Sequence, residues 1–130
     1  MRRSAPIVAV VAVVDDDSRI LESLESLLSS VGHEVRVYPN AKEFLATRPF
    51  SDLDCLVSDL GMPGLSGLEL VGILRMERPT LPVIVITAQR NEQMRAAALA
   101  LGARFVFPKP LDETQLLEAI QAVMTAPPPP

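Results

Sequence analysis

The chain has 130 residues, of which 48% are hydrophobic and 22% charged, and its formal net charge is -4. This length favours one compact domain, and the composition is typical of an ordinary soluble globular protein rather than a disordered or fibrous one. The acidic balance and the lack of clustered Lys and Arg argue against direct binding of nucleic acid.

An apolar run over residues 7–14 is the first predicted strand. Its residues are mostly β-branched, which is the pattern of a strand buried on both faces of a parallel sheet. The run is too short to span a membrane, and it ends on aspartates rather than on the small-residue cleavage site of a signal peptide. We therefore expect neither a membrane segment nor a leader here.

Helical and extended patterns then alternate along the chain. Apolar spacings of one, three and four predict a helix over residues 18–31, which Gly32 ends. The further predicted strands cover residues 34–38, 53–58, 81–86 and 104–107. The further predicted helices cover residues 41–47, 67–77, 91–101 and 113–124. Asn40 is expected to cap the second helix and Asp112 the last one. Five strands that alternate with five helices predict a doubly wound α/β fold: a parallel sheet with right-handed crossovers and helices on both faces.

Charged and hydroxyl side chains collect where the predicted strands end. These residues are Asp15, Asp16, Asp59, Thr87 and Lys109, and the carboxyl ends of the strands are where such folds bind ligands. Carboxylates about 5 Å apart repel by roughly 3 kcal/mol per pair at an effective dielectric constant near 20, which favours a hard divalent cation between them. Lys109 could bind a phosphoryl oxygen, and Thr87 could donate a hydrogen bond from its hydroxyl. Together with the carboxylates, these side chains indicate phosphoryl transfer onto an aspartate.

Each of these residues also has an ordinary structural explanation when it is taken alone. An Asp after a strand is more often a helix cap or a turn former than a ligand, and Asp17 or Ser18 is expected to cap the following helix. Cys55 is the single cysteine, which fits a reducing cytoplasm, and we expect it to be a small buried residue. We expect His33 to be a solvated turn residue. Separate structural explanations of this kind do not predict that an acid pair, a further Asp, a Thr and a Lys all occur at the ends of the predicted strands.

The segments VVDDD, LVSDLGMPGLSGLEL, VIVITA and GARFVFPKP together resemble the receiver domain of bacterial two-component response regulators, over residues 6–124. The phrase around Asp59 is similar to receivers that precede a helix-turn-helix DNA-binding domain. The resemblance implies a flavodoxin-like (βα)5 fold with strand order 2-1-3-4-5. It also implies a receiver domain over residues 1–125, followed by a proline-rich tail or the start of a linker over residues 126–130.

The resemblance makes Asp59 the phosphoacceptor. It implies that Asp15, Asp16, Asp59 and the main-chain carbonyl of Gly61 hold Mg²⁺. Asp16 would be the direct ligand of the acid pair, and Asp15 would act largely through water.

The phosphate-binding and switch residues follow from the same resemblance. Lys109 would bind the phosphoryl group, and its bond to Pro110 would be cis. Thr87 would be the switch hydroxyl, with Ala88 directly after it.

One position departs from the family pattern. Three residues before the lysine the family usually carries Phe or Tyr, and here that residue is Val106. Strand alternation directs its neighbours Phe105 and Phe107 to the opposite face, so neither replaces the missing ring. Coupling from the switch hydroxyl to an aromatic ring is therefore in question.

The function that the resemblance implies is signalling rather than enzymatic turnover. A histidine kinase would transfer a phosphoryl group to Asp59, and only this transfer and the later dephosphorylation would be self-catalysed. Phosphorylation would then switch partner binding or homodimerisation through the face of the fourth helix, fifth strand and fifth helix. A downstream effector or a C-terminal DNA-binding domain would regulate transcription in the cytoplasm, with no nucleic-acid or membrane contact from this domain.

Two alternatives remain beside this interpretation. Val106 is compatible with an atypical receiver that acts mainly as a protein-interaction module and switches weakly. An aspartate-nucleophile phosphatase would have a similar arrangement of residues. Such enzymes usually carry a second acid two residues after the nucleophile, and Gly61 at that position cannot act as a general acid.

Overall fold

The computed structural model describes residues 8–62, 64–88 and 92–125, in which strands and helices alternate as predicted. The strands are β1 (Val10–Val14), β2 (Glu34–Tyr38), β3 (Cys55–Asp59), β4 (Val83–Thr87) and β5 (Phe105–Pro108). The helices are α1 (Ser18–Ser30), α2 (Ala41–Leu45), α3 (Gly67–Glu77), α4 (Glu92–Ala100) and α5 (Glu113–Thr125).

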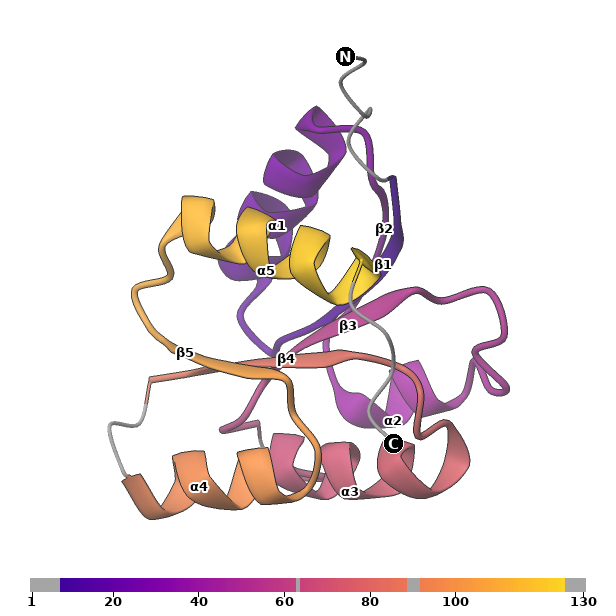
Figure 1. The fold of residues 1–130 in the computed structure, drawn as a ribbon, viewed down its shortest axis with the longest axis vertical. Coiled ribbons are helices and arrows are strands. Elements are labelled where there is room, and N and C mark those ends of the chain that lie inside the picture. The colour runs from indigo at the N-terminus through magenta and orange to yellow at the C-terminus, as the bar shows by residue number, and fades with distance from the viewer. Residues whose placement is uncertain (1–7, 63, 89–91, 126–130) are drawn as a thin grey trace.

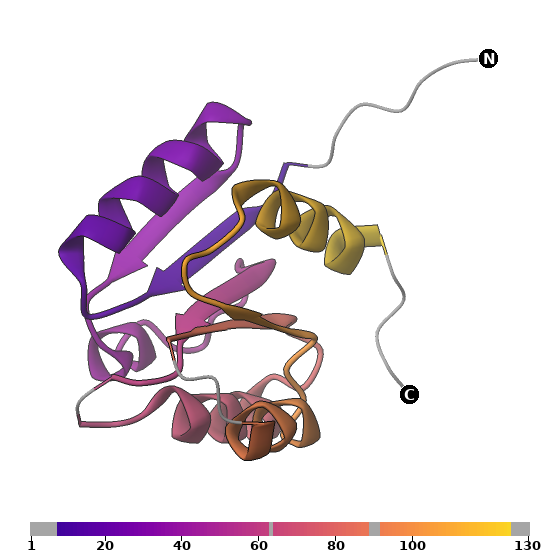
Figure 2. The same ribbon diagram turned by 90° about the vertical axis from the view of Figure 1, so that its left-hand side faces the viewer.

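The strands form one parallel sheet of five in the order β2-β1-β3-β4-β5. This confirms both the doubly wound architecture and the predicted strand order. Figures 1 and 2 show α1 and α5 against one face of the sheet and α2, α3 and α4 against the other. The direction of winding reverses at β1, so the carboxyl ends of β1 and β3 flank the crevice where folds of this class bind ligands.

Each face of the sheet has its own hydrophobic core, and β1 contributes to both. Ala12 and Val14 pack on the side of α2, α3 and α4, whereas Val11 and Val13 pack on the side of α1 and α5. All of these side chains are at most 1% exposed. Full burial of a valine stabilises the fold by roughly 1.5 kcal/mol or more, so the valine run is the expected sequence of a strand covered on both faces.

The first strand is shorter than predicted, and a buried histidine lies beside its start. Val8 is exposed and β1 begins at Val10, while Ile7 lies outside the described residues. The expectation that His33 is a solvated turn residue is wrong, because its side chain is buried. Its Nδ1 accepts a hydrogen bond from the main-chain N–H of Ala9 at 2.9 Å. The ring therefore serves as a fixed acceptor for the segment that leads into β1.

Several element boundaries differ from the predicted ones. The strands β3 and β4 each end one residue later than predicted, so Asp59 and Thr87 are the last residues of their strands rather than the first of the following loops. The helix α2 ends at Leu45 instead of residue 47. Arg48 precedes Pro49, and the residue before a proline disfavours helical backbone, which explains an end in this region.

The predicted helix caps are confirmed. Asp17, Asn40 and Asp112 each accept a hydrogen bond from a main-chain N–H in the first turn of the following helix. The helix α3 has a complete capping box between Ser66 and Glu69, in which each side chain binds the main-chain N–H of the other residue. Polar side chains thus define where these helices begin.

The predicted tail over residues 126–130 lies outside the described residues. The division into a domain over residues 1–125 and a tail therefore stays a prediction. Within the described ranges, every helix is too short or too polar to cross a lipid bilayer.

Candidate functional site

The predicted site residues meet at one edge of the sheet, where the strands have their carboxyl ends. Asp15 follows β1, Asp59 ends β3, Thr87 ends β4 and Lys109 follows β5. The main-chain N–H of Lys109 donates to the carbonyl of Thr87 at 2.9 Å, which extends the pairing of β4 and β5 into the site. The Lys109–Pro110 bond is cis, as the resemblance implies. The spacing of these residues is therefore set by the sheet.

Three carboxylates form an acidic cluster at this edge. Asp15, Asp16 and Asp59 each place one carboxylate oxygen within 4.8 Å of the others. Asp15 and Asp59 are only 2% and 7% exposed, whereas Asp16 is exposed. Two charges at about 5 Å repel by roughly 3 kcal/mol at an effective dielectric constant of about 20. The cluster is therefore stabilised by any cation that lies next to it.

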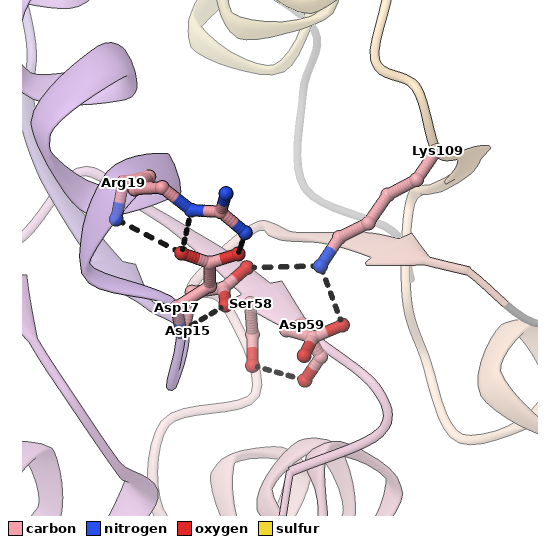
Figure 3. Close-up of polar contacts among 6 residues, drawn as sticks. All are labelled: Asp15, Asp17, Arg19, Ser58, Asp59 and Lys109. Atoms are coloured by element: carbon pink, nitrogen blue, oxygen red, sulfur yellow. Dashed lines mark hydrogen bonds and ion pairs between the residues drawn. The ribbon is translucent and has the colours of Figure 1, made fainter.

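Lys109 brings one positive charge to the acidic cluster from β5. Its Nζ lies 3.2 Å from Oδ2 of Asp15 and 3.4 Å from Oδ1 of Asp59 (Figure 3). Burial by itself lowers the pKa of Lys109, but the attraction of the two carboxylates outweighs burial and the pKa is raised. The lysine is thus held in its charged form. This edge holds three carboxylates and one ammonium, so it keeps a negative balance when all three carboxylates are ionised.

Both oxygens of Asp15 are engaged. Oδ1 accepts a hydrogen bond from the main-chain N–H of Asp17 at 2.9 Å, and Oδ2 faces Lys109. Burial raises the pKa of Asp15, and the charge of Asp59 raises it further. The hydrogen bond from Asp17 and the charge of Lys109 act in the opposite direction without cancelling the rise. The side chain is therefore oriented in advance, and a further cation would favour its ionised form.

This donor set fits a hard divalent cation such as Mg²⁺. Mg²⁺ prefers oxygen ligands, binds through one or two carboxylates and keeps several waters, and exposed Asp16 leaves one side of the cluster open to solvent. Gly61 is also exposed, and a β-carbon there would meet no atom within 4 Å. The main chain at Gly61 therefore borders open space. The assignment of Asp16 as the direct ligand and Asp15 as a ligand through water stays a prediction.

The side chain of the third aspartate in the run, Asp17, bonds to Arg19 and is not part of the acidic cluster. Oδ1 of Asp17 accepts a hydrogen bond from the main-chain N–H of Arg19 at 2.9 Å, and its Oδ2 pairs with the Arg19 guanidinium at 3.1 Å (Figure 3). Arg19 also lowers the pKa of Asp17. The prediction that Asp17 is a helix cap is confirmed, so the run of three aspartates divides into two cluster residues and a cap.

The helix α3 packs on the main chain that carries Asp59, a contact that sequence reasoning missed. The N–H of Gly67 donates to the carbonyl of Leu60 at 3.1 Å, and a β-carbon at position 67 would overlap the carbonyl oxygen of Asp59. The capping box of Ser66 and Glu69 fixes where the helix starts. The sequence signal was present, since Ser66 and Glu69 have the capping-box spacing with a glycine in the first helical position.

The predicted switch residues lie on β4 and β5. Thr87 is 5% exposed, and Ala88 beside it is exposed. Val106 packs in the core under α2, α3 and α4, whereas Phe105 and Phe107 pack in the opposite core with ring centroids 5.6 Å apart. The prediction that both phenylalanines point away from Val106 is confirmed. Neither ring can therefore take the place of the missing aromatic side chain at position 106.

The fold and this edge define a flavodoxin-like α/β domain with an acidic cluster and a lysine at the carboxyl ends of its strands. The family model of the response regulator receiver domain matches residues 11–121. The chain belongs to this family, as the resemblance of its motifs indicated.

Known proteins similar to the chain include a transcriptional regulator, an uncharacterised protein and a receiver domain protein of known structure. The transcriptional regulatory protein FixJ of Bradyrhizobium diazoefficiens is 32% identical over 112 residues, which cover 86% of this chain and 55% of FixJ. An uncharacterised 14.6 kDa protein of Leptolyngbya boryana is 40% identical over 122 residues, which cover 92% of this chain and 92% of that protein. The crystal structure of a response regulator receiver domain protein from Clostridium thermocellum superimposes with a TM-score of 0.85 at 28% identity, covering 90% of this chain and 94% of that one. The chain thus spans about half the length of FixJ.

Proposed function

We propose that this receiver domain accepts a phosphoryl group on Asp59 from the phosphohistidine of a kinase. The observation that carries the proposal is the position of Asp59. Its carboxylate lies in the acidic cluster with Asp15 and Asp16, and 3.4 Å from the ammonium of Lys109. A nucleophilic carboxylate between a cation-binding acid pair and a fixed positive charge is suited to phosphoryl transfer.

The side chains at the edge have distinct parts in this transfer. One carboxylate oxygen of Asp59 attacks phosphorus, and a P–O bond forms as the P–N bond to histidine breaks. The electron pair of the broken bond stays on the imidazole, which takes up a proton. Lys109 offsets charge on the transferred oxygens, and the Thr87 hydroxyl at the end of the next strand adds a donor. Water later hydrolyses the acyl phosphate and restores Asp59, so the domain is a phosphoacceptor rather than an enzyme with turnover.

Mg²⁺ is the proposed cofactor. Asp15, Asp16, Asp59 and the carbonyl of Gly61 would hold it, and when bound it offsets negative charge on the phosphoryl oxygens. The closeness of three carboxylate oxygens, each within 4.8 Å of the others, supports this assignment. Asp15 needs no reorientation for this task, because its oxygens are already fixed by the main chain and by a lysine.

Output is proposed to pass from Thr87 and Ala88 to the face made by α4, β5 and α5. Phosphorylation would bias an equilibrium between two conformations, and this face would bind a second receiver or an effector. FixJ supports a role in transcription, because the chain matches about half of that transcriptional regulatory protein. A DNA-binding domain or a separate effector would then read out the signal in the cytoplasm. The net charge of -4 supports a receiver that does not itself contact nucleic acid.

A second candidate function is an interaction module that keeps the site but switches little. Val106 favours it, because no ring at this position can move when Thr87 engages a phosphoryl group. Amide chemical shifts with and without acetyl phosphate and Mg²⁺ separate the two functions. Changes confined to the site favour the module, whereas changes that extend over α4, β5 and α5 favour the switch. Val106→Tyr restores a ring and provides the comparison.

Mass spectrometry of the intact protein tests the phosphoacceptor. After incubation with acetyl phosphate and Mg²⁺, the wild type should gain the mass of one phosphoryl group, and Asp59→Asn should gain nothing. Asp17→Asn is the matched control, because Asn also caps helices and the Asp17 side chain bonds to Arg19 rather than to the cluster residues. It should be labelled like the wild type. Labelling of Asp59→Asn would overturn the assignment.

A further inference from the structure

A cavity of about 560 Å³ lies at the opposite edge of the sheet, between the C-terminal ends of α3 and α4 and the segments that lead into β4 and β5. We call it the arginine pocket, because Arg75, Arg78 and Arg104 line it. Apolar side chains that include Leu74 and Leu81 form much of the remaining wall. The pocket lies where the strands begin, so it is separate from the acidic cluster, which lies where they end.

Little of the charge of the arginine pocket is compensated locally. The residues that line it include no acidic side chain. Across residues 8–62, 64–88 and 92–125, none of its arginines forms an ion pair. Arg36 and, more weakly, Arg78 lower the pKa of Asp52, but Asp52 is already paired with Arg36 at 2.8 Å. In a chain with a net charge of -4, the pocket is therefore a local concentration of positive charge.

Neutral acceptors orient two of the guanidinium groups. Nη1 of Arg75 donates to the carbonyl of Ala100 at 3.0 Å, and Nη1 of Arg78 donates to the carbonyl of Phe50. A carbonyl fixes the direction of a guanidinium without cancelling its charge. Because each guanidinium has five N–H donors, several remain for a second acceptor. Two of the three guanidinium groups are thus held in place by one donor each, and their other donors are left for a ligand that carries several oxygens.

We propose that the arginine pocket binds a nucleoside phosphate. Phosphate oxygens match the planar fork of arginine, and an arginine that does not contact phosphate can stack on the base. Leu99, which is 38% exposed, and half-buried Leu101 line the pocket and offer apolar surface to the rest of the ligand. A volume of about 560 Å³ lies in the range of roughly 300–1,000 Å³ that is usual for small-molecule sites. This binding is independent of phosphorylation at Asp59.

A titration of the ¹⁵N-labelled chain followed by NMR tests the proposal. The probes are AMP, GMP, CMP and UMP, with adenosine and inorganic phosphate for comparison, all without Mg²⁺. At least one nucleotide should shift the amides of residues 99–104 and the Nε signals of the lining arginines, with higher affinity than inorganic phosphate. Adenosine should shift none of them, because it lacks the anionic group.

Variants of Arg104 make the test specific. Its side chain has no hydrogen-bond partner among the residues that the structure describes, so Arg104→Gln should fold normally and weaken nucleotide binding about tenfold or more. Arg104→Lys keeps the positive charge but lacks the planar guanidinium, so its nucleotide affinity should lie between those of the wild type and Arg104→Gln. Arg95→Gln on α4, away from the pocket and paired with Glu92, should bind like the wild type. The proposal is overturned if no nucleotide shifts these signals, if shifts fall only at the acidic cluster, or if inorganic phosphate binds equally well.

Discussion

Gly67 packs so closely against the main chain of Asp59 that a β-carbon at position 67 would overlap the carbonyl oxygen of Asp59. Gly67→Ala must therefore displace either α3 or the end of β3. We expect it to lower the free energy of unfolding by about 1–3 kcal/mol, as overpacking does. Phosphorylation should also slow, because the Asp59 carboxylate would move relative to Lys109. Urea denaturation and time-resolved mass spectrometry measure the two effects.

Gly72→Ala is the matched control for Gly67→Ala. Gly72 lies in the middle of α3, and a β-carbon there would meet no atom within 4 Å. Ala is favoured over Gly inside a helix by about 1 kcal/mol, so this variant should be more stable and should be phosphorylated normally. Similar effects of the two substitutions would contradict the close packing of Gly67.

Lys109→Gln should separate cation binding from phosphoryl transfer. The change removes an ammonium that lies 3.2 Å from Asp15 and 3.4 Å from Asp59. The acidic cluster becomes more negative, so Mg²⁺ should bind several-fold more tightly, whereas phosphorylation should slow because less charge is offset on the transferred oxygens. Isothermal titration calorimetry and mass spectrometry measure these quantities. Lys42→Gln, exposed on α2, should change neither, and weaker Mg²⁺ binding by Lys109→Gln would count against this account.

His33 should make stability depend on pH. Burial lowers the pKa of His33 below its ordinary value of 6.5, so the unfolded chain takes up a proton at a higher pH than the folded protein. The contribution of His33 to the free energy of unfolding is complete above pH 6.5, and it declines as the pH falls from 6.5 towards the pKa of His33 in the folded protein. The protonated ring also loses the acceptor that binds Ala9. Each unit of pKa difference corresponds to about 1.4 kcal/mol of unfolding free energy at low pH.

Urea denaturation over a pH series, with His33→Gln as reference, isolates this contribution. The amide of Gln does not titrate, and its oxygen can accept a hydrogen bond. The pKa of Asp15 is raised, which has the opposite sign: it favours the folded state at acid pH and is lost as the pH rises through the folded pKa. Asp15 is present in both proteins, so its effect cancels in the difference. Parallel pH profiles would show that His33 does not titrate as described.

Cys55 should resist alkylation in the folded protein. Burial raises the pKa of its thiol to about 12, so little thiolate is present at neutral pH, and the side chain has no solvent exposure. Iodoacetamide should modify the native protein no faster than unfolding exposes Cys55, whereas the same protein in urea should react quickly. Rapid modification under native conditions would contradict the buried position of Cys55 in β3.

The site was predictable because a parallel sheet turns sequence order into spatial proximity. Asp15, Asp59, Thr87 and Lys109 each lie at the end of an apolar run, and parallel pairing brings such ends to one edge. The alternation of side chains in β5 likewise predicted that Val106 points away from its aromatic neighbours. The role of each residue as ligand, nucleophile or switch came instead from the resemblance to receivers.

Other features depend on contacts that no local pattern contains. His33 has the same sequence neighbours whether it is solvated or buried, and its burial depends on a contact with Ala9, 24 residues away. Arg75, Arg78 and Arg104 come from two separate segments and form no run of positive charge, so only folding brings them around one cavity. Contacts of this kind require the tertiary structure.

The sheet also divides the molecule into two packing compartments. Leu28 of α1 belongs to the core on one face, and Leu74 of α3 belongs to the core on the other, with β1, β3 and β4 between them. The free-energy changes of Leu28→Ala and Leu74→Ala should therefore add in the double variant. For protein engineering, one face can be remodelled to accept a new partner while the packing under the other face is left as it is.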